Sequence, residues 1–317
     1  MVNRFPFAHT FSIVARDAST GQLGVAVQSH WFSVGGTVPW AEAGVGAVAT
    51  QAFAEPEYGP KGLDLLRRGA APEKALADLL KADDGREVRQ VGIVDSKGRA
   101  TAHTGARCME HAGHSIGPGF TAQANMMAGP GIWQAMAEAY EASSASCDLA
   151  ERLLRALEAA QRIGGDIRGQ QSACILVVSA ASTGKPWQDR LFDLRVEDSE
   201  HPIEELRRLV GIQRAYASMN AGDAHLAASR VTEALAAYGA ALDLAPSNQE
   251  IRFWSALTMA DGGMVDEALP ALGALFDAEP RWREVLRRMP ATGLLRGGPA
   301  LAARILDALE RPQPGTH

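Results

Sequence analysis

The chain has 317 residues, of which 46% are hydrophobic and 21% charged, and its formal net charge is −6. These values are typical of a soluble globular protein with one large and one small domain, or with two of medium size. Aromatic residues make up only 6%, and lysines and arginines form no block. The composition therefore argues against nucleic acid or a membrane surface as a partner.

Three cysteines, Cys108, Cys147 and Cys174, stand far apart in the sequence. An odd and scattered set indicates a reducing compartment and not a disulfide framework. The first ten residues contain no apolar run of signal-peptide length. No segment approaches the roughly 18 apolar residues of a membrane span. We therefore expect a cytoplasmic protein.

Strand-like and helix-like segments alternate up to residue 196. The strand-like runs at 10–17 and 23–29 flank a turn with Gly21, and a second pair surrounds a turn at 95–98, so both pairs are typical of antiparallel hairpins. Because hairpins build antiparallel sheets and the helices come in pairs, this pattern predicts an α+β sandwich of helices over stacked sheets. The remaining expected elements are strands at 45–53, 89–95, 99–105, 120–127, 172–180 and 189–197 and helices at 58–69, 72–82, 132–142 and 147–165.

From Pro202 onward the sequence is helical throughout. Segments 233–246 and 267–280 share a Glu-Ala-Leu start and a closing proline, and they lie 34 residues apart. This period and the matching Ala234 and Ala268 resemble tetratricopeptide repeats (TPR), whose grooves hold extended peptides. We expect a small all-α domain of this type that binds a protein partner. A plain helical bundle is the alternative.

Thr10 stands at the head of the first strand-like run, with nine residues before it. A hydroxyl group attacks an amide only when a base takes its proton, and a chain-terminal amine with a pKa of about 8 can be that base. Cleavage before Thr10 would place the amine and the hydroxyl together at the head of one strand. A β-branched residue that only packs in a strand is the alternative.

Three long motifs in the first two thirds of the chain are "TFSIVARDASTGQLGVAVQSHWFSVGG", "AGHSIGPGFTAQANMMAGP" and "GGDIRGQQSACILVV". They resemble an uncharacterised bacterial family with a fold like that of the N-terminal-nucleophile (Ntn) hydrolases. This resemblance covers residues 9–196 and implies a four-layer αββα sandwich whose first strand begins with the nucleophile. It therefore implies that Thr10 hydrolyses an amide bond, provided that residues 1–9 are removed.

Two loop residues and two strand residues could assist this nucleophile. Asp166 and Ser172 resemble the aspartate and serine that support the terminal amine of threonine hydrolases, although Asp166 could instead pair with Arg168. Gln123 and Asn125 alternate with alanines, so on a strand both amides point to one side and need polar partners. We expect Asn125 to stabilise an oxyanion and Gln123 to contact the substrate, unless both only tie the strand to a loop.

Two more pairs of polar residues stand near strand ends. Ser29 and His30 end a strand-like run, where an imidazole could act as an acid or base near neutral pH. Gln51 and Glu55 lie near the end of another run. We expect these four residues to contact the substrate. A packed histidine without a role is the alternative for His30.

His103, Cys108, His111 and His114 form a separate group within twelve residues of sequence. Side chains of these types bind zinc, and the neighbouring Glu110 could serve as a base in a metal hydrolase. Their spacing matches none of the established zinc patterns. We therefore expect no cofactor and keep a zinc-dependent hydrolase as a minor alternative.

The sequence as a whole predicts an N-terminal extension at 1–9, a sandwich domain at 10–196, a linker at 197–204 and a TPR-like domain at 205–317. The leading hypothesis is a homo-oligomeric amidohydrolase that cleaves a small amide or peptide-like bond. The alternative is a non-catalytic binding or scaffold module, in which the sandwich is inactive and the helical tail recruits a protein.

Overall fold

The computed structural model describes residues 7–8, 10–143 and 147–310. The chain divides into two compact units, Met1–Val210 and Gly211–His317. The first unit holds two β-sheets with their covering helices, and the second is helical. Within the described ranges, no helix is both long and apolar enough to cross a membrane.

Two antiparallel sheets form the first unit. The five-stranded sheet, called the first sheet below, has the order β1-β5-β6-β7, and β4 also pairs with β5. The six-stranded second sheet has the order β11-β10-β3-β2-β9-β8, which places β2 near its centre. The strands are β1 (Phe7–Ala8), β2 (Thr10–Arg16), β3 (Leu23–Ser29), β4 (Pro39–Glu42), β5 (Gly46–Phe53), β6 (Arg89–Asp95), β7 (Ala100–Thr104), β8 (Gly113–Gly117), β9 (Phe120–Ala124), β10 (Ser172–Val178) and β11 (Arg190–Val196).

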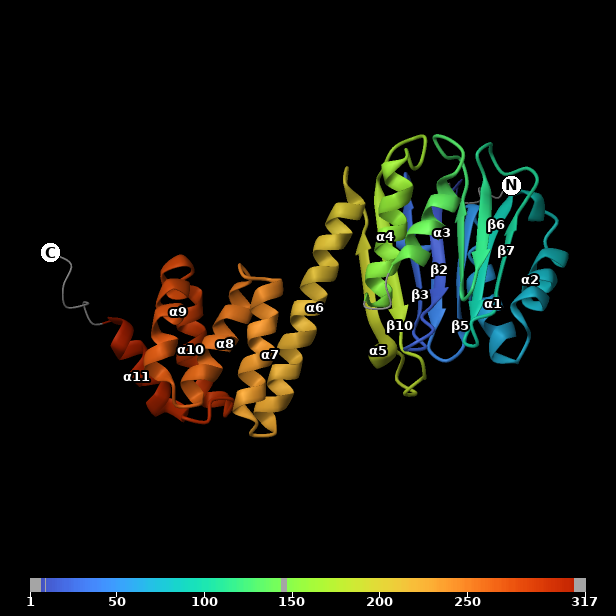
Figure 1. The fold of residues 1–317 in the computed structure, drawn as a ribbon. Helices are drawn as coiled ribbons and strands as arrows, with labels where there is room; N and C mark the ends of the chain where they lie inside the picture. Colours follow the sequence, from blue (N-terminus) through green and yellow to red (C-terminus); the bar gives the residue numbers. More distant parts are fainter. Residues whose placement is uncertain (1–6, 9, 144–146, 311–317) are drawn as a thin grey trace, which may run out of the picture. The chain divides into compact units, whose positions relative to one another are not determined.

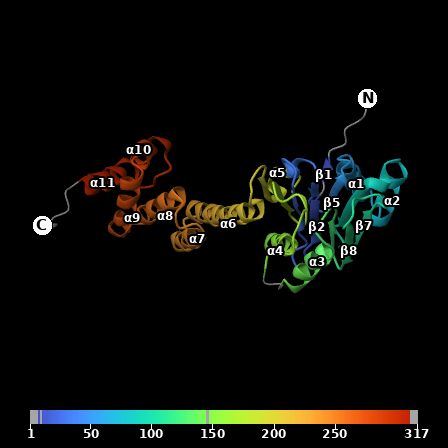
Figure 2. The same ribbon diagram turned by 90° about the horizontal axis from the view of Figure 1, so that it is seen from above.

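Helices cover the outer face of each sheet (Figures 1 and 2). Helices α1 (Tyr58–Arg67) and α2 (Pro72–Lys81) pack on Val48, Val91 and Ile93 of the first sheet. Helices α3 (Ile132–Ala142) and α4 (Leu149–Arg162) pack on the second sheet through a separate apolar cluster. The layers therefore run helices, first sheet, second sheet, helices. The mixed α+β class, with two antiparallel sheets and a helical C-terminal region, is confirmed.

The side chains of β2 alternate between two environments. Phe11 and Ile13 join the cluster under α3 and α4, while Val14 joins a third cluster that lies between the two sheets. Because successive strand residues point to opposite faces, Thr10 and Ser12 also face the first sheet. The same alternation in the other strands fills the space between the sheets.

The layer between the sheets has a polar half and an apolar half. The polar half lies at the end of the sheets where β2 begins, and each of its side chains is fully buried. The apolar half fills the remaining space with aliphatic side chains, also buried. The polar half comprises Thr10, Ser12, Ser29, Gln51, Gln90, Gln123, Asn125 and Ser172, and the apolar half includes Val14, Val25, Val27, Ala47, Ala49, Val94 and Leu176.

The second unit keeps the predicted 34-residue interval in its core. Ala234 and Ala268, one interval apart, are both fully buried, as are Tyr238 and Leu272. Helix α6 (Pro202–Ala227) contributes residues 202–210 to the first unit and the rest to the second. The other helices of this unit are α7 (Val231–Leu244), α8 (Gln249–Asp261), α9 (Val265–Ala278), α10 (Arg281–Arg288) and α11 (Gly298–Glu310).

Three strands and several short helices are additions to the sequence prediction. Strand β8 (Gly113–Gly117) is half-buried and has a glycine at each end, and β4 begins with Pro39, so neither carries a strong strand pattern. Strand β1 has only two residues. The predicted strand 120–127 ends at Ala124, because Met126 has a left-handed backbone (φ 58°). The short helices are η1 (Val34–Gly36), η2 (Arg86–Val88), α5 (Pro186–Asp189) and η3 (Met289–Thr292).

Candidate functional site

Thr10 lies in a row of polar residues that crosses β10, β3 and β2 and ends just beyond β9. It pairs with Ser29 of β3, which pairs with Ser172 of β10. On the other side, the backbone N–H of Asn125, just after β9, donates to the Thr10 carbonyl at 3.1 Å. The Thr10 hydroxyl donates to Ser29 Oγ at 3.1 Å. The register of the second sheet therefore brings four of the predicted site residues into one line.

The Thr10 carbonyl is held by side-chain amides as well. Gln51 Nε2 donates to it at 3.1 Å across the gap between the sheets, and Asn125 Nδ2 donates at 3.3 Å. Counting the backbone N–H of Asn125, this oxygen accepts three hydrogen bonds. A carbonyl with three donors is fixed in direction, so the start of β2 is tied to both sheets.

Gln90 of β6 links the amides of the polar half. Its Oε1 accepts from Gln51 Nε2 at 2.7 Å and from Asn125 Nδ2 at 2.8 Å. Its Nε2 donates to Thr104 Oγ1 and to the carbonyls of Gly113 and Ala124. The sequence analysis missed Gln90. The sequence feature that could have identified it is a single amide directly before the apolar run "VGIV".

Ser12 and Gln123 complete the network. The Ser12 hydroxyl donates to Gln51 Oε1 at 2.6 Å and accepts from Gln123 Nε2 at the same distance. Gln123 Oε1 accepts from Thr121 at 3.0 Å. A Cβ on Gly92 would stand 2.4 Å from Gln123 Oε1, so this glycine makes room for the amide. Gln123 therefore ties β9 to β2 within the network.

Asp166 and Ser172 support the loop that follows β3. The Asp166 carboxylate accepts from the backbone N–H of His30 at 3.2 Å and pairs with the Arg168 guanidinium at 2.7 Å. Ser172 Oγ donates to the Trp31 carbonyl and accepts from the backbone N–H of Val34. The pairing of Asp166 with Arg168 is the alternative that the sequence analysis left open. These two residues therefore shape the loop beside the Thr10 row.

Strained backbone surrounds the polar half. Among the described residues, five that are not glycine have a positive φ. Ala52 (φ 70°) directly follows Gln51, Met126 (φ 58°) directly follows Asn125, and Ser33 (φ 58°) lies in the loop after β3. A left-handed conformation costs such a residue about 1–2 kcal/mol, and strain of this kind gathers at functional sites. Its location marks this end of the sheets as the candidate site.

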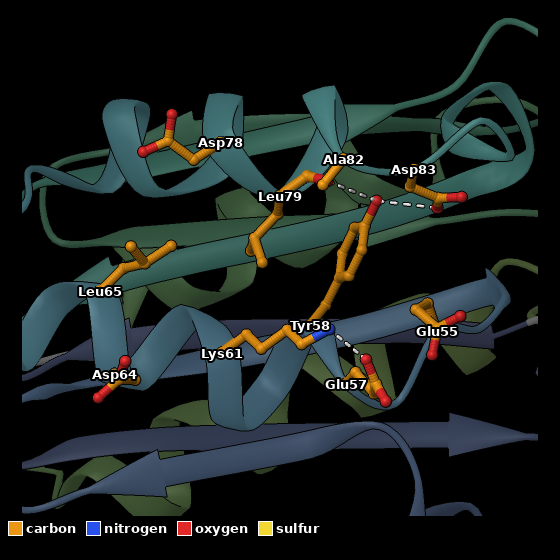
Figure 3. A pocket seen from close by; sticks show the side chains of 10 residues that line it. All are labelled: Glu55, Glu57, Tyr58, Lys61, Asp64, Leu65, Asp78, Leu79, Ala82 and Asp83. Carbon is orange, nitrogen blue, oxygen red and sulfur yellow. Dashed lines mark hydrogen bonds and ion pairs between the residues drawn. The ribbon is translucent and has the colours of Figure 1, made fainter.

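Glu55 lines a pocket between α1 and α2, on the outer side of the first sheet (Figure 3). The pocket has a volume of about 360 Å³. The phenol of Tyr58 reaches across it and donates to Asp83 at 2.9 Å. Glu55 also lies 3.7 Å from the buried guanidinium of Arg89. The structure therefore places Glu55 with this pocket and not in the amide network around Thr10.

The charged residues that line this pocket are mostly acidic, with Glu55, Glu57, Asp64, Asp78 and Asp83 against Lys61. Burial disfavours the charged form of Asp83, but hydrogen bonds from Arg89, Gly85 and Tyr58 outweigh it and lower the Asp83 pKa. Burial and the bond to Asp83 raise the Tyr58 pKa. The phenol therefore stays protonated near neutral pH, and each of these carboxylates is paired with a lysine or an arginine.

The four potential zinc ligands are not assembled as a metal site. His103 Nε2 contacts the Arg86 carbonyl at 3.0 Å, and His114 Nδ1 contacts Thr104 Oγ1 at 2.8 Å. The Cys108 thiol donates to the Arg89 carbonyl, and burial raises its pKa to about 11. Over the described part of the chain, no group of three or more histidine, cysteine or acidic side chains is placed to hold a metal ion. The geometry therefore does not support the zinc alternative.

Comparison with known proteins gives a relative but no activity. The crystal structure of protein SPO2555 from Silicibacter pomeroyi, which carries the family model DUF1028, is similar with a TM-score of 0.57 and 32% sequence identity. The similarity covers 63% of this chain and 87% of that one. No curated protein matches the chain. The family of unknown function DUF1028 matches residues 10–206, and the chain belongs to this family.

Proposed function

We propose that the chain is an amide-bond hydrolase of the Ntn type, in which Thr10 becomes the nucleophile once residues 1–9 are removed. The observation that carries this proposal is the setting of Thr10. It begins a central strand, and its hydroxyl and carbonyl are both held by the polar half. The strained residues around it and the start of the family match at residue 10 add support.

The order of the layers supports the same fold assignment. Helices, two antiparallel sheets and helices follow one another in the first unit, which is the arrangement expected of an Ntn-like αββα sandwich. In such a sandwich the nucleophile heads a strand of a central sheet. Strand β2 is such a strand, and Thr10 is its first residue.

The proposed chemistry starts with hydrolysis of the peptide bond before Thr10, by the chain itself or by a protease. The released α-amine, with a pKa of about 8, takes the proton of the Thr10 hydroxyl. The oxygen attacks the substrate carbonyl, the α-amine passes the proton to the nitrogen of the substrate amide, and the substrate's amine leaves, so that its acyl group remains as an ester on Thr10. Water then cleaves the ester, releases the acid and restores the hydroxyl.

Supporting roles follow from the contacts of the neighbouring residues. Asn125 Nδ2 and Gln51 Nε2 donate to the Thr10 carbonyl, and in this proposal these bonds fix the orientation of Thr10 and its hydroxyl. Asp166 and Ser172 fix the loop after β3, including His30, on the side of Ser29. Asn125 stabilises the oxyanion in this proposal only after its amide turns from Gln90 toward the substrate.

Intact mass and N-terminal sequencing of the purified chain test the proposal. We expect a species that begins at Thr10, and hydrolysis of small amides that is abolished in Thr10→Ala and retained in Thr10→Ser. Thr10→Val, which keeps the β-branched shape, is the matched control for packing. A native preparation that consists only of chains beginning at Met1 or Val2 would overturn the free-amine mechanism.

A second candidate, a non-catalytic binding module, is favoured by one observation. Thr10 is fully buried, and Phe7 and Ala8 ahead of it are paired with β5. We propose that a chain which keeps residues 1–9 acts through its second unit, a TPR-like array supported by the repeated core positions Ala234 and Ala268. Binding of a partner protein that survives in Thr10→Ala would favour this candidate.

A further inference from the structure

We infer that the edge of β5 at Ala52 and Phe53 is a binding slot for one strand of an extended peptide. The inference deepens the proposed function and rests on it, because the slot is emptied when residues 1–9 leave. It assigns the substrate to peptides, with the residues on the acyl side of the cleaved bond in the slot. Strand addition of this kind draws its affinity from backbone hydrogen bonds.

The slot is one section of an edge that is otherwise occupied. Strand β6 pairs with β5 along residues 46–52 and takes up one edge. On the other edge, β4 pairs with residues 46–49, and the backbone N–H of Thr50 donates to the Val38 carbonyl. Only Ala52 and Phe53 of this edge are paired with β1, through Ala8 and Phe7. Loss of β1 would therefore open a section of the β5 edge that is two residues long.

The slot adjoins the candidate nucleophile. Strand β1 ends at Ala8 in the first sheet, and β2 begins at Thr10 in the second. Gln51, next to the slot, donates to the Thr10 carbonyl. A peptide that follows the path of β1 therefore presents its next carbonyl to the Thr10 hydroxyl. In that arrangement residues 1–9 are the first product.

The conformation of the slot is held by contacts from β6 and the loop before it, and not by β1. The Arg89 guanidinium donates to the Phe53 carbonyl and is itself held by Asp83 at 2.7 Å. Only 2% of the Arg89 side chain is exposed. Ala52 is 1% exposed and has a left-handed backbone. Because these contacts come from β6 and the loop before it, the shape of the edge does not depend on β1.

An empty slot is costly at Ala52, whose partner on this edge is Ala8, whereas the Phe53 carbonyl keeps its bond from Arg89. A backbone donor or acceptor left without a partner in a buried place costs about 1–3 kcal/mol. A peptide backbone supplies both donors and acceptors along its length, whereas a small amide supplies one of each. The structure therefore points to a peptide and not to a small amide as the ligand of this edge.

The test uses the full chain with Thr10→Ala, which cannot hydrolyse, so that binding is measured apart from catalysis. Phe7→Pro with Ala8→Pro removes both β1 amide donors, and Phe7→Val with Ala8→Val is the matched control that keeps them. The probe is a fluorescent peptide with the sequence of residues 1–9. We expect binding to the proline variant, at least about tenfold weaker binding to the valine control, and a similar loss when the two amides of the peptide are N-methylated.

Hydrogen exchange of the β5 segment provides a second measurement. We expect faster exchange in the proline variant and recovery when the peptide is added. The inference is overturned if a folded proline variant, or Ala8→Pro alone where the double variant does not fold, fails to bind the peptide or binds the N-methylated form equally well. Failure of the proposed function is seen separately, as a native chain that keeps residues 1–9 by intact mass.

Discussion

The two halves of the layer between the sheets are equally buried but are stabilised in different ways. The apolar half gains free energy from each aliphatic group removed from water, and the gain grows with buried area. The polar half gains little net free energy from each hydrogen bond, because its groups were bonded to water before folding. Its amides, however, depend on one another for partners. The difference suggests that the polar half is kept for positioning and the apolar half for stability.

The largest difference in the free energy of unfolding is expected between Gln90→Leu in the polar half and Val25→Ala in the apolar half. Gln90→Leu removes the oxygen that Gln51 and Asn125 share as an acceptor, and it removes the donor to Thr104 Oγ1 and to two backbone carbonyls, so we expect the free energy of unfolding to fall by about 4 kcal/mol. Val25→Ala in the apolar half removes only methyl groups and should cost about 2 kcal/mol. Urea unfolding measures both values.

Cleavage before Thr10 should differ between the same two variants more clearly than the free energy of unfolding does. We expect Gln90→Leu to abolish the cleavage before Thr10, while Val25→Ala keeps it. Gln90→Glu, which preserves the shape and the accepting oxygen but not the donors, controls for packing. If Val25→Ala proved the more damaging variant by both measurements, the positioning role of the polar half would be refuted.

The next effect concerns Asp17, in the turn that closes the apolar end between β2 and β3. Burial raises its pKa, but hydrogen bonds from Ser19 and Thr20 outweigh burial and lower the pKa from 3.8 to about 2. A carboxyl whose pKa is lowered in the folded state stabilises above its unfolded pKa, and this stability is lost as the pH falls from about 4 to 2. The loss should reach about 2 kcal/mol.

Thermal unfolding of the unmodified chain and Asp17→Asn between pH 7 and 2 measures this effect. The variant should be less stable at pH 7 and should show a smaller loss of stability on acidification. Asp193→Asn, at an ion pair near the surface, is a suitable comparison. Parallel pH curves for Asp17→Asn and the unmodified chain would show that this turn does not depend on the charge.

The smallest expected effect is that of an alanine-to-glycine substitution on the free energy of unfolding, and its sign should differ between the two halves. Ala52→Gly relieves a left-handed residue beside the polar half and should raise the free energy of unfolding by about 1 kcal/mol. Ala49→Gly, on the same strand in the apolar half, should lower it by about 1 kcal/mol, because the backbone there is regular. Chemical denaturation of both variants gives the signs. Equal signs would mean that Ala52 carries no strain.

Local patterns predict most elements of the first unit. Hairpin β2–β3 follows from two apolar runs around Gly21, and α2 follows from Pro72 and its apolar spacing. The order of strands in the sheets does not follow from such patterns. Strand β9 lies beside β2 through pairing over a long sequence distance, and no local residue specifies that partner.

The candidate site is predictable in its parts but not in its connections. Asn125 is found from its alternation with alanines and Gln51 from its place near a strand end, and the structure brings both to Thr10. Gln90 links them from the other sheet, which only the stacking of the sheets reveals. Glu55 lies apart from Gln51 in the pocket between α1 and α2, because nearness in sequence does not determine which side of the sheet a loop residue occupies.

The central place of β2 has a consequence for synthesis of the chain. Its partner on one side, β3, follows within a few residues, but β9 begins only at Phe120. At about 10 residues per second, a ribosome needs roughly 10 s to deliver that partner. During this interval the nascent chain carries an apolar strand with one open edge, which is a site for aggregation. We therefore expect the newborn chain to engage chaperones until β9 has emerged.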